Sequence, residues 1–323
     1  MNKPRITELL QKSSYEMFLQ VWSSGAQLPS FIAVERGLKP AMDVWVRRGT
    51  WEAFEHLVSR FGLRYHIDTY FDRHSEDTLK TLPPDSFTTT RAILSREFTN
   101  RAEAHVFVAK TQASLTGAVA AGWYPLVIDE SVVEKHLADH GKFGEALGYP
   151  ACCRDFFRRR NNWYYDNSYY AAYCETTSAP HTLSNGLLRH TAFCLTPHLP
   201  CSFACEASIA YGAGLREVIS REAPLYAAEI DRRLANPMLC LSELHIYRFE
   251  GELSSANRVD YEFVEPVEPT THSDPLYQML ARGDACILDG NIVRVERRGS
   301  QIDAYAARAD KHGPEFPFVI QCS

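Results

Sequence analysis

Two short cysteine-bearing segments constrain this 323-residue chain more than any other feature of its sequence. The first reads Gly-Tyr-Pro-Ala-Cys-Cys and ends at Cys152 and Cys153. The second reads His-Leu-Pro-Cys-Ser-Phe-Ala-Cys-Glu and contains Cys201 and Cys205. Six of the nine cysteines lie within residues 147–208, so we expect a fold that brings the two segments together around one site.

Both segments share a plan in which a proline is followed by cysteines and then by a helical pattern. Proline suits the first position of a helix, because its φ is fixed and the first N–H of a helix has no partner. We therefore predict that each pair of cysteines lies in the first turn of a helix. The positive end of the helix dipole favours the thiolate there, and the thiolate is the form that binds metals.

This arrangement predicts a metal site and, before other kinds, an iron–sulfur cluster. Adjacent cysteines such as Cys152 and Cys153 chelate one tetrahedral ion awkwardly, whereas the separate iron atoms of a cluster accept neighbouring thiolates. Cys201 and Cys205, four residues apart, would project from one face of a helix. The expected cofactor is a [4Fe-4S] cluster, with zinc or a mononuclear iron as alternatives. If only three cysteines ligate, one iron stays open to bind substrate as a Lewis acid.

Other residues near the two segments are candidates for the same site. His198 precedes Cys201 in the second segment and is expected to be a ligand or to support one. Glu206 and Glu145 are the nearest candidate acid or base. Cys194 could complete the coordination shell. The remaining cysteines are expected to pack as small buried side chains; they are Cys174, Cys240, Cys286 and Cys322.

The same residues carry a resemblance to a known family. Gly-Glu-Ala-Leu-Gly-Tyr-Pro-x-Cys-Cys, residues 144–153, and His-x-Pro-Cys-Ser-x-x-Cys-Glu-x-Ser, residues 198–208, resemble blocks of a family of microbial and archaeal proteins grouped under a domain of unknown function. The shared blocks cover roughly residues 144–210. The resemblance implies that the four cysteines and His198 are important, but it implies no particular reaction.

Composition places the chain among folded globular proteins. Hydrophobic residues make up 45% and charged residues 23%, which is near the usual mixture. The net charge of −6 gives no overall attraction to nucleic acid. No apolar run approaches about 18 residues and the N-terminus lacks a signal-peptide pattern, so we expect a cytoplasmic protein that makes no membrane contact. An odd number of cysteines in a reducing compartment favours free, metal-bound or catalytic thiols over disulfides.

The hydrophobic pattern predicts an α+β fold with a largely helical core, a small β-α-β unit and a C-terminal β-rich module. We expect a helical lobe over residues 1–100, an α/β and helical cysteine-bearing core over 101–240 and the β-rich module over 241–323. In the first lobe, residues 31–46 repeat a helical theme, and Thr50 and Gly62 bound a further helix.

Strands and helices alternate in the middle of the sequence. A strand at 105–109, a helix at 112–121 and a strand at 124–128 make up the β-α-β unit. Its first turn has no glycine, so no nucleotide cofactor is predicted. A following helix places His136 and His140 on one face, where an exposed surface is favoured over a metal site.

The C-terminal part carries strand signals at 244–249, 258–264, 285–288 and 292–296. The last two are joined by Asp289-Gly290, a two-residue hairpin turn.

These features lead to one functional hypothesis and two alternatives. The leading hypothesis is a cytoplasmic metalloenzyme with a cysteine-ligated iron–sulfur or iron site that acts on a small-molecule or peptide-derived substrate in specialised biosynthesis. The first alternative is a cysteine-dependent transferase or thiol redox enzyme, with Cys153 or Cys201 as nucleophile. The second is a non-catalytic partner protein with a structural zinc.

Overall fold

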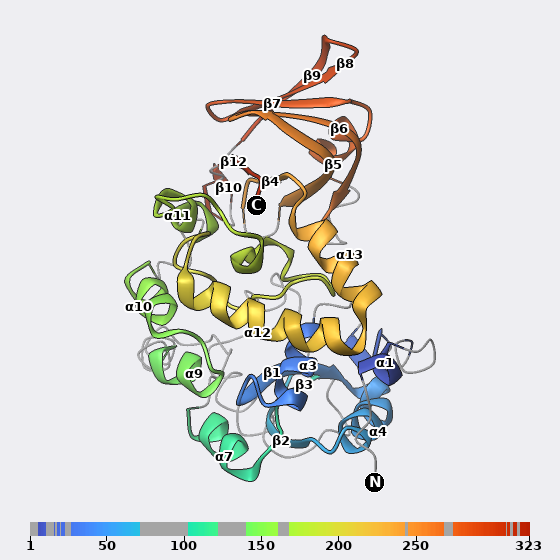
Figure 1. Ribbon diagram of the computed structural model, residues 1–323, viewed down its shortest axis with the longest axis vertical. Coiled ribbons are helices and arrows are strands. Elements are labelled where there is room, and N and C mark those ends of the chain that lie inside the picture. The colour runs from blue at the N-terminus through green and yellow to red at the C-terminus, as the bar shows by residue number, and fades with distance from the viewer. Residues whose placement is uncertain are drawn as a thin grey trace, which may run out of the picture. The chain divides into compact units, whose positions relative to one another are not determined.

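The computed structural model describes residues 6–10, 16, 18–19, 21–22, 27–71, 103–121, 140–160, 168–242, 245–267, 274–307, 309–310, 313–314 and 317–323. The chain forms two compact units, residues 1–154 and 155–323, and each contains its own antiparallel sheet (Figure 1). Helices combined with separate antiparallel sheets confirm the predicted α+β class. The finer division at residues 100 and 240 stays a prediction, and its first boundary lies outside the described residues.

The first unit is built on a three-stranded sheet with the strand order β1-β3-β2. Both neighbours pair with the central strand in antiparallel register. The strands are β1 (Ala41–Arg47), β2 (Arg64–Phe71) and β3 (Glu103–Ala109). The helices described in this unit are α1 (Ile6–Leu9), α3 (Leu28–Arg36), α4 (Trp51–Arg60), α7 (Gln112–Ala121) and α9 (His140–Ala146).

The prediction that residues 31–46 continue a helical pattern is wrong in its second half. Helix α3 ends at Gly37, whose φ of 76° is the left-handed conformation that glycine adopts at helix ends. Strand β1 then begins at Ala41. Its buried Val44 and Val46 alternate with the exposed Trp45, and this period of two is typical of a strand.

Other local predictions are confirmed. Helix α4 has Thr50 as its N-cap residue, and Gly62 follows it with a φ of 65°. Strand β3 and helix α7 match the first two elements of the predicted β-α-β unit. The predicted strand at 124–128 lies outside the described residues, as does His136.

Helix α10 (Ala151–Arg160) contains the division between the two units. The second unit then contains α11 (Ser168–Cys174), α12 (Glu206–Glu222), α13 (Pro224–Leu234) and α14 (Pro275–Leu280). Short 3-10 turns at Thr182–Ser184 and Gly186–Leu188 lie between α11 and α12. Among the described helices, none combines the length and the apolar character needed to cross a membrane.

The C-terminal sheet of the second unit has seven antiparallel strands in the order β12-β4-β5-β6-β7-β8-β9 (Figure 1). Its strands are β4 (Met238–Cys240), β5 (Ile246–Ser255), β6 (Arg258–Pro266), β7 (Ala285–Asp289), β8 (Ile292–Arg297), β9 (Ser300–Ala306) and β12 (Phe318–Ile320). Strands β10 (Ala309–Asp310) and β11 (Gly313–Pro314) form a separate short pair.

The predicted β-rich module corresponds to this sheet. The four predicted strands match β5, β6, β7 and β8, and Asp289-Gly290 joins β7 to β8 as expected. Gly290 has a φ of 62°, the conformation that such a hairpin turn requires. Leu276 and Leu280 of α14 pack with buried side chains of the sheet to form its hydrophobic core.

Candidate metal centre

Four cysteine sulfur atoms from the two predicted segments lie together. Each Sγ lies within 4.8 Å of the other three. We call this set the four-cysteine group; it consists of Cys152, Cys153, Cys201 and Cys205. The prediction that the two segments share one site is confirmed at this level, and such a group could hold a metal.

Cys152 and Cys153 lie in the first turn of α10, as predicted. The carbonyl of Pro150 accepts the N–H of Arg154, which is the first hydrogen bond of the helix. Successive residues of a helix project about 100° apart, so adjacent thiols face different surroundings. Cys152 is exposed, whereas Cys153 is buried with 2% of its surface accessible.

A tight turn before α10 sets the position of these two cysteines. Gly148 has a φ of 77°, and a Cβ added there would lie 2.5 Å from Cδ of Pro40. Its N–H donates to the carbonyl of Glu145, and the N–H of Tyr149 donates to the carbonyl of Gly144. Only glycine fits this combination of left-handed backbone and close contact.

The second pair of cysteines does not lie in a helix, which corrects the prediction. Helix α12 begins at Glu206, so Cys205 is its N-cap residue and Cys201 lies in the preceding turn. The N–H of Cys205 donates to the carbonyl of Ser202, which closes a tight turn between the two thiols. Pro200 therefore starts a turn here. A proline followed by cysteines does not by itself distinguish a helix start from a turn that leads into one.

Phe203, at the centre of this turn, fixes it to the rest of the unit. The Phe203 side chain is fully buried. Its N–H donates a hydrogen bond to Oγ1 of Thr176 at 2.9 Å. Its carbonyl accepts hydrogen bonds from the N–H of His181 at 2.8 Å and from Oγ of Ser184. These bonds hold the turn, and with it Cys201 and Cys205, in one conformation.

Two helix N-termini contribute to the electrostatics of the group. Cys152 and Cys153 occupy the first turn of the ten-residue α10, and Cys205 is the residue that directly precedes the 17-residue α12. The unpaired N–H groups of a helix N-terminus carry partial positive charge, which favours anions such as thiolates. The surroundings therefore suit four negatively charged sulfur ligands.

His198 lies in the second segment but is not part of the four-cysteine group. The residue is 5% exposed, and its Nε2 lies 2.9 Å from Oγ of Ser208 on α12. Its ring also lies edge-on to Tyr211, with 5.8 Å between the ring centroids. Through these contacts the His198 ring packs against Ser208 and Tyr211 in α12. Its role as a metal ligand stays a prediction.

The two predicted acid or base residues are exposed. Glu206 is the first residue of α12 and follows Cys205 directly. Glu145 forms an ion pair with Arg154, at 2.9 Å between Oε2 and Nη1. Their role in catalysis stays a prediction.

The other cysteines lie outside the group. Cys194 donates to the carbonyl of Thr196 at 3.0 Å, and burial raises the pKa of its thiol to about 12, so it is a neutral packed thiol. Cys240, Cys286 and Cys322 are buried, as predicted, whereas Cys174 at the end of α11 is exposed. Every cysteine of the chain is among the described residues, and none of them is in a disulfide.

The spacing of the sulfurs fits a metal ion. Four thiolates at about 2.3 Å from one ion lie about 3.8 Å apart along the edges of a tetrahedron. The sulfurs of Cys152 and Cys153 are 3.9 Å apart. Thiolates on different irons of a four-iron cluster radiate from separate corners and lie further apart than this.

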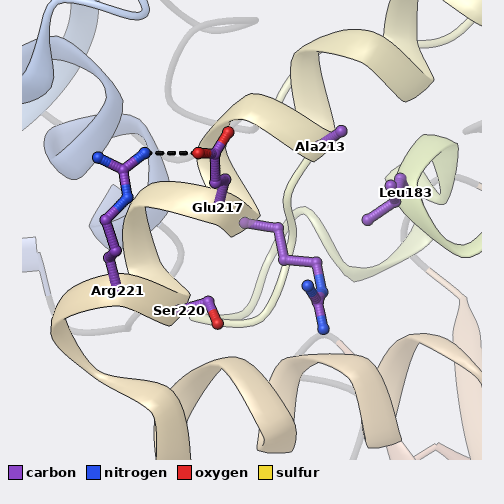
Figure 2. A pocket seen from close by; sticks show the side chains of 6 residues that line it. Leu183, Ala213, Glu217, Ser220 and Arg221 are labelled. Atoms are coloured by element: carbon purple, nitrogen blue, oxygen red, sulfur yellow. Dashed lines mark hydrogen bonds and ion pairs between the residues drawn. The ribbon is translucent and has the colours of Figure 1, made fainter.

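The second unit also contains a shallow pocket on α12. It has a volume of about 460 Å³, and Figure 2 shows Leu183, Ala213, Glu217, Ser220 and Arg221 among its lining residues. Glu217 and Arg221 pair with each other at 2.6 Å. Arg216, which also lines the pocket, pairs with Asp231. The charged residues that line the pocket are therefore paired with residues of opposite charge. The lining residues that the structure describes contain no group that could bind a metal ion.

The first unit contains a polar cluster of Lys39, Asp43 and His105 that no sequence pattern indicated. Lys39 and His105 are buried, and Asp43 is partly exposed. Lys39 is 3% exposed, and its Nζ lies 5.0 Å from the ring centroid of Tyr149. Burial lowers the pKa of Lys39 to about 8, although the charge of Asp43 opposes that shift. Burial raises the pKa of Asp43, but the interaction with His105 and the charge of Lys39 together lower that pKa by more, so it lies below its usual value.

The pairing of β1 with β3 explains part of this cluster. In the sheet, Asp43 pairs with Phe107 and Trp45 pairs with His105, so Asp43 and His105 lie on the same face of neighbouring strands. Nε2 of His105 lies 3.7 Å from Oδ2 of Asp43. No sequence pattern marks Lys39 as buried.

Comparisons of the chain with family models, curated proteins and solved structures found no match.

Proposed function

We propose that the protein binds one tetrahedral metal ion, zinc in the first place, through the four-cysteine group. The observation that carries the proposal is the sulfur spacing, with 3.9 Å between Cys152 and Cys153 and no pair of the four beyond 4.8 Å. This spacing supports one ion over the [4Fe-4S] cluster expected from the sequence. A tetrahedral set of four sulfurs suits Zn²⁺, and a single iron ion is the alternative with the same geometry.

A metal-dependent enzyme is the second candidate, and the exposure of Cys152 favours it. A structural zinc is usually closed by its protein ligands, whereas a catalytic metal keeps a position that substrate can reach. The expected enzyme is cytoplasmic and acts on a small-molecule or peptide-derived substrate in specialised biosynthesis. Glu206 and Glu145 are its candidate acid or base. The buried position of Cys153 gives less support to a free cysteine nucleophile at that residue.

The experiment that tests the proposal is anaerobic purification followed by metal analysis and an absorption spectrum. One zinc ion per chain in a colourless protein supports the proposal, and one iron supports the alternative metal at the same site. Several irons together with acid-labile sulfide indicate a cluster. A preparation without metal that also fails to take up Zn²⁺ contradicts the proposal.

A further inference from the structure

We infer that Cys152 is the exchangeable ligand of the metal site, an inference that rests on the proposed function. A thiol from outside the protein can take the place of Cys152 on the ion. The ligand class is a soft, uncharged or weakly charged thiol, such as a small thiol metabolite or the cysteine of a peptide. Cys153, Cys201 and Cys205 then form the part of the site that retains the ion.

The burial of the four ligands is strongly unequal. Cys153 is 2% exposed and Cys205 is 6% exposed, while Cys201 is partly exposed. Cys152 is the exposed member of the group. A ligand can be replaced only where an incoming molecule reaches the ion from the side of the departing atom, and this side is open at Cys152.

The unequal burial follows from the helix that carries the adjacent cysteines. Cys152, Asp155 and Arg159 lie at positions i, i+3 and i+7 of α10 and are all exposed. Cys153 and Phe156, three residues apart on another face, are buried. The two neighbouring thiols thus start from different faces of one helix, about 100° apart. Cys152 can turn away from the ion without disturbing buried packing.

The charged residues near Cys152 favour an incoming ligand with a soft sulfur atom over one that is simply negatively charged. Asp155 pairs with Arg158 at 3.0 Å between Oδ1 and Nη2. Arg154 pairs with Glu145 at 2.9 Å. Arg154 and Arg158 therefore each have a carboxylate partner, and Nε of Arg159 donates to the carbonyl of Asp155 at 3.3 Å. The negative charge of four thiolates already exceeds the charge of a divalent ion, so an additional anion would bind weakly. A sulfur ligand from outside, in contrast, can replace a cysteine sulfur with similar affinity for the metal.

The exchange balances without an additional reagent. The incoming thiol gives up its proton and forms a metal–sulfur bond, while the bond to Cys152 breaks and its sulfur takes up a proton. The number of thiolates on the ion and the net charge stay the same. Three protein ligands plus an exchangeable position is the arrangement of catalytic zinc sites, and metal coordination keeps a thiol in its nucleophilic form at neutral pH.

The test uses full-length protein loaded with Co²⁺, whose sulfur-to-metal charge-transfer absorption increases with the number of thiolates. We expect Cys152→Ser to bind one Co²⁺ and to lose about a quarter of this absorption, as for three thiolates in place of four. Adding 2-mercaptoethanol should restore the lost absorption. Ethylene glycol, which has oxygen in place of the sulfur, should not.

Cys153→Ser is the matched variant, because it removes the neighbouring thiol from the buried side of the same helix turn. We expect 2-mercaptoethanol to restore no absorption there. The inference is overturned if Cys152→Ser loses its metal as completely as Cys153→Ser, or if the thiol restores both variants equally.

Alkylation of the unmodified sequence provides a second measurement that does not depend on a variant folding. Iodoacetamide forms a carbon–sulfur bond with a thiolate and releases iodide. In the zinc-loaded protein we expect peptide mapping to find label on Cys152 and on the exposed Cys174, which serves as an internal reference. Cys153, Cys201 and Cys205 should stay unlabelled, and the ion should stay bound.

The outcomes separate this inference from the proposed function. Label on Cys174 alone, with Cys152 protected until a chelator removes the ion, overturns the inference and leaves the metal site intact. A protein that binds neither Co²⁺ nor Zn²⁺ contradicts the proposed function, and the inference falls with it.

Discussion

The sulfur atoms of Cys152 and Cys153 lie 3.9 Å apart, although the two residues are neighbours in the first turn of one helix. That distance matches the edge of a tetrahedron of thiolates around one ion, about 3.8 Å. Adjacent cysteines are therefore compatible with a site for one metal ion as well as with a cluster.

Cys205→Ser tests whether a buried member of the four-cysteine group binds the ion. The change keeps the size of the side chain but removes the soft thiolate. We expect metal content, measured by elemental analysis after anaerobic purification, to fall from one ion per chain to a small fraction of that value.

Cys286→Ser is the control for that variant. Cys286 is fully buried in β7, and burial raises the pKa of its thiol to about 12, so it is a neutral packing residue. We expect unchanged metal content and a loss of about 1–3 kcal/mol in the free energy of unfolding from burying a hydroxyl. Equal metal loss in both variants would show that the effect is general destabilisation.

Gly148→Ala tests the turn that presents the first cysteine pair. The new Cβ would meet Pro40, and alanine is strained at a φ of 77°. We expect a loss of about 1–3 kcal/mol in the free energy of unfolding and weaker zinc binding in a chelator competition. Gly117→Ala is the control, because a Cβ at this position in α7 meets nothing within 4 Å. The account of the turn is wrong if both variants bind zinc equally well.

Thr176→Val tests the anchor of the second pair. Valine has the shape of threonine but cannot accept the hydrogen bond from the N–H of Phe203, which would then be buried without its partner. We expect the free energy of unfolding to fall by about 1–3 kcal/mol and zinc affinity to fall with it. Thr177→Val, at the exposed neighbouring position, should change neither quantity. Equal affinities in the two variants would contradict the anchoring role.

Lys39→Met tests the buried cluster of the first unit through its pH dependence. Burial lowers the pKa of Lys39 from 10.5 to about 8, so the unfolded chain binds more protons than the folded chain between those values. The charged form of this lysine therefore destabilises the fold. The penalty is complete below about pH 8, and it is relieved as pH rises from about 8 to 10.5.

The measurement is urea unfolding of both proteins with the same metal content. From about pH 7.5 to about pH 10, the free energy of unfolding of the unmodified protein should rise by about 2–3 kcal/mol relative to Lys39→Met. Parallel pH profiles would show that the lysine is not buried in its charged form at neutral pH.

Local sequence signals predicted elements whose causes are themselves local. Gly290 specified the β7–β8 hairpin, and Thr50 and Gly62 marked the ends of α4. The helical theme predicted over residues 31–46 misses strand β1, because Gly37 ends α3 and Pro40 precedes the strand within that range. The partners of each strand depend on contacts distant in sequence, which periodicity does not reveal.

The candidate site shows the same division. The sequence predicted which four thiols lie together, because each pair of cysteines follows a proline in a short segment of its own. It did not predict their geometry. The turn that contains Cys201 and Cys205 is held by hydrogen bonds between Phe203 and three residues that lie well before the segment. These residues are Thr176, His181 and Ser184.

The most direct test of the central claim is X-ray absorption spectroscopy at the zinc edge on protein purified anaerobically, together with the metal content of the same sample. The account predicts one zinc ion per chain, with a single shell of four sulfur atoms at about 2.3 Å. Iron with neighbouring iron atoms and sulfide would contradict it, as would zinc surrounded by nitrogen and oxygen ligands.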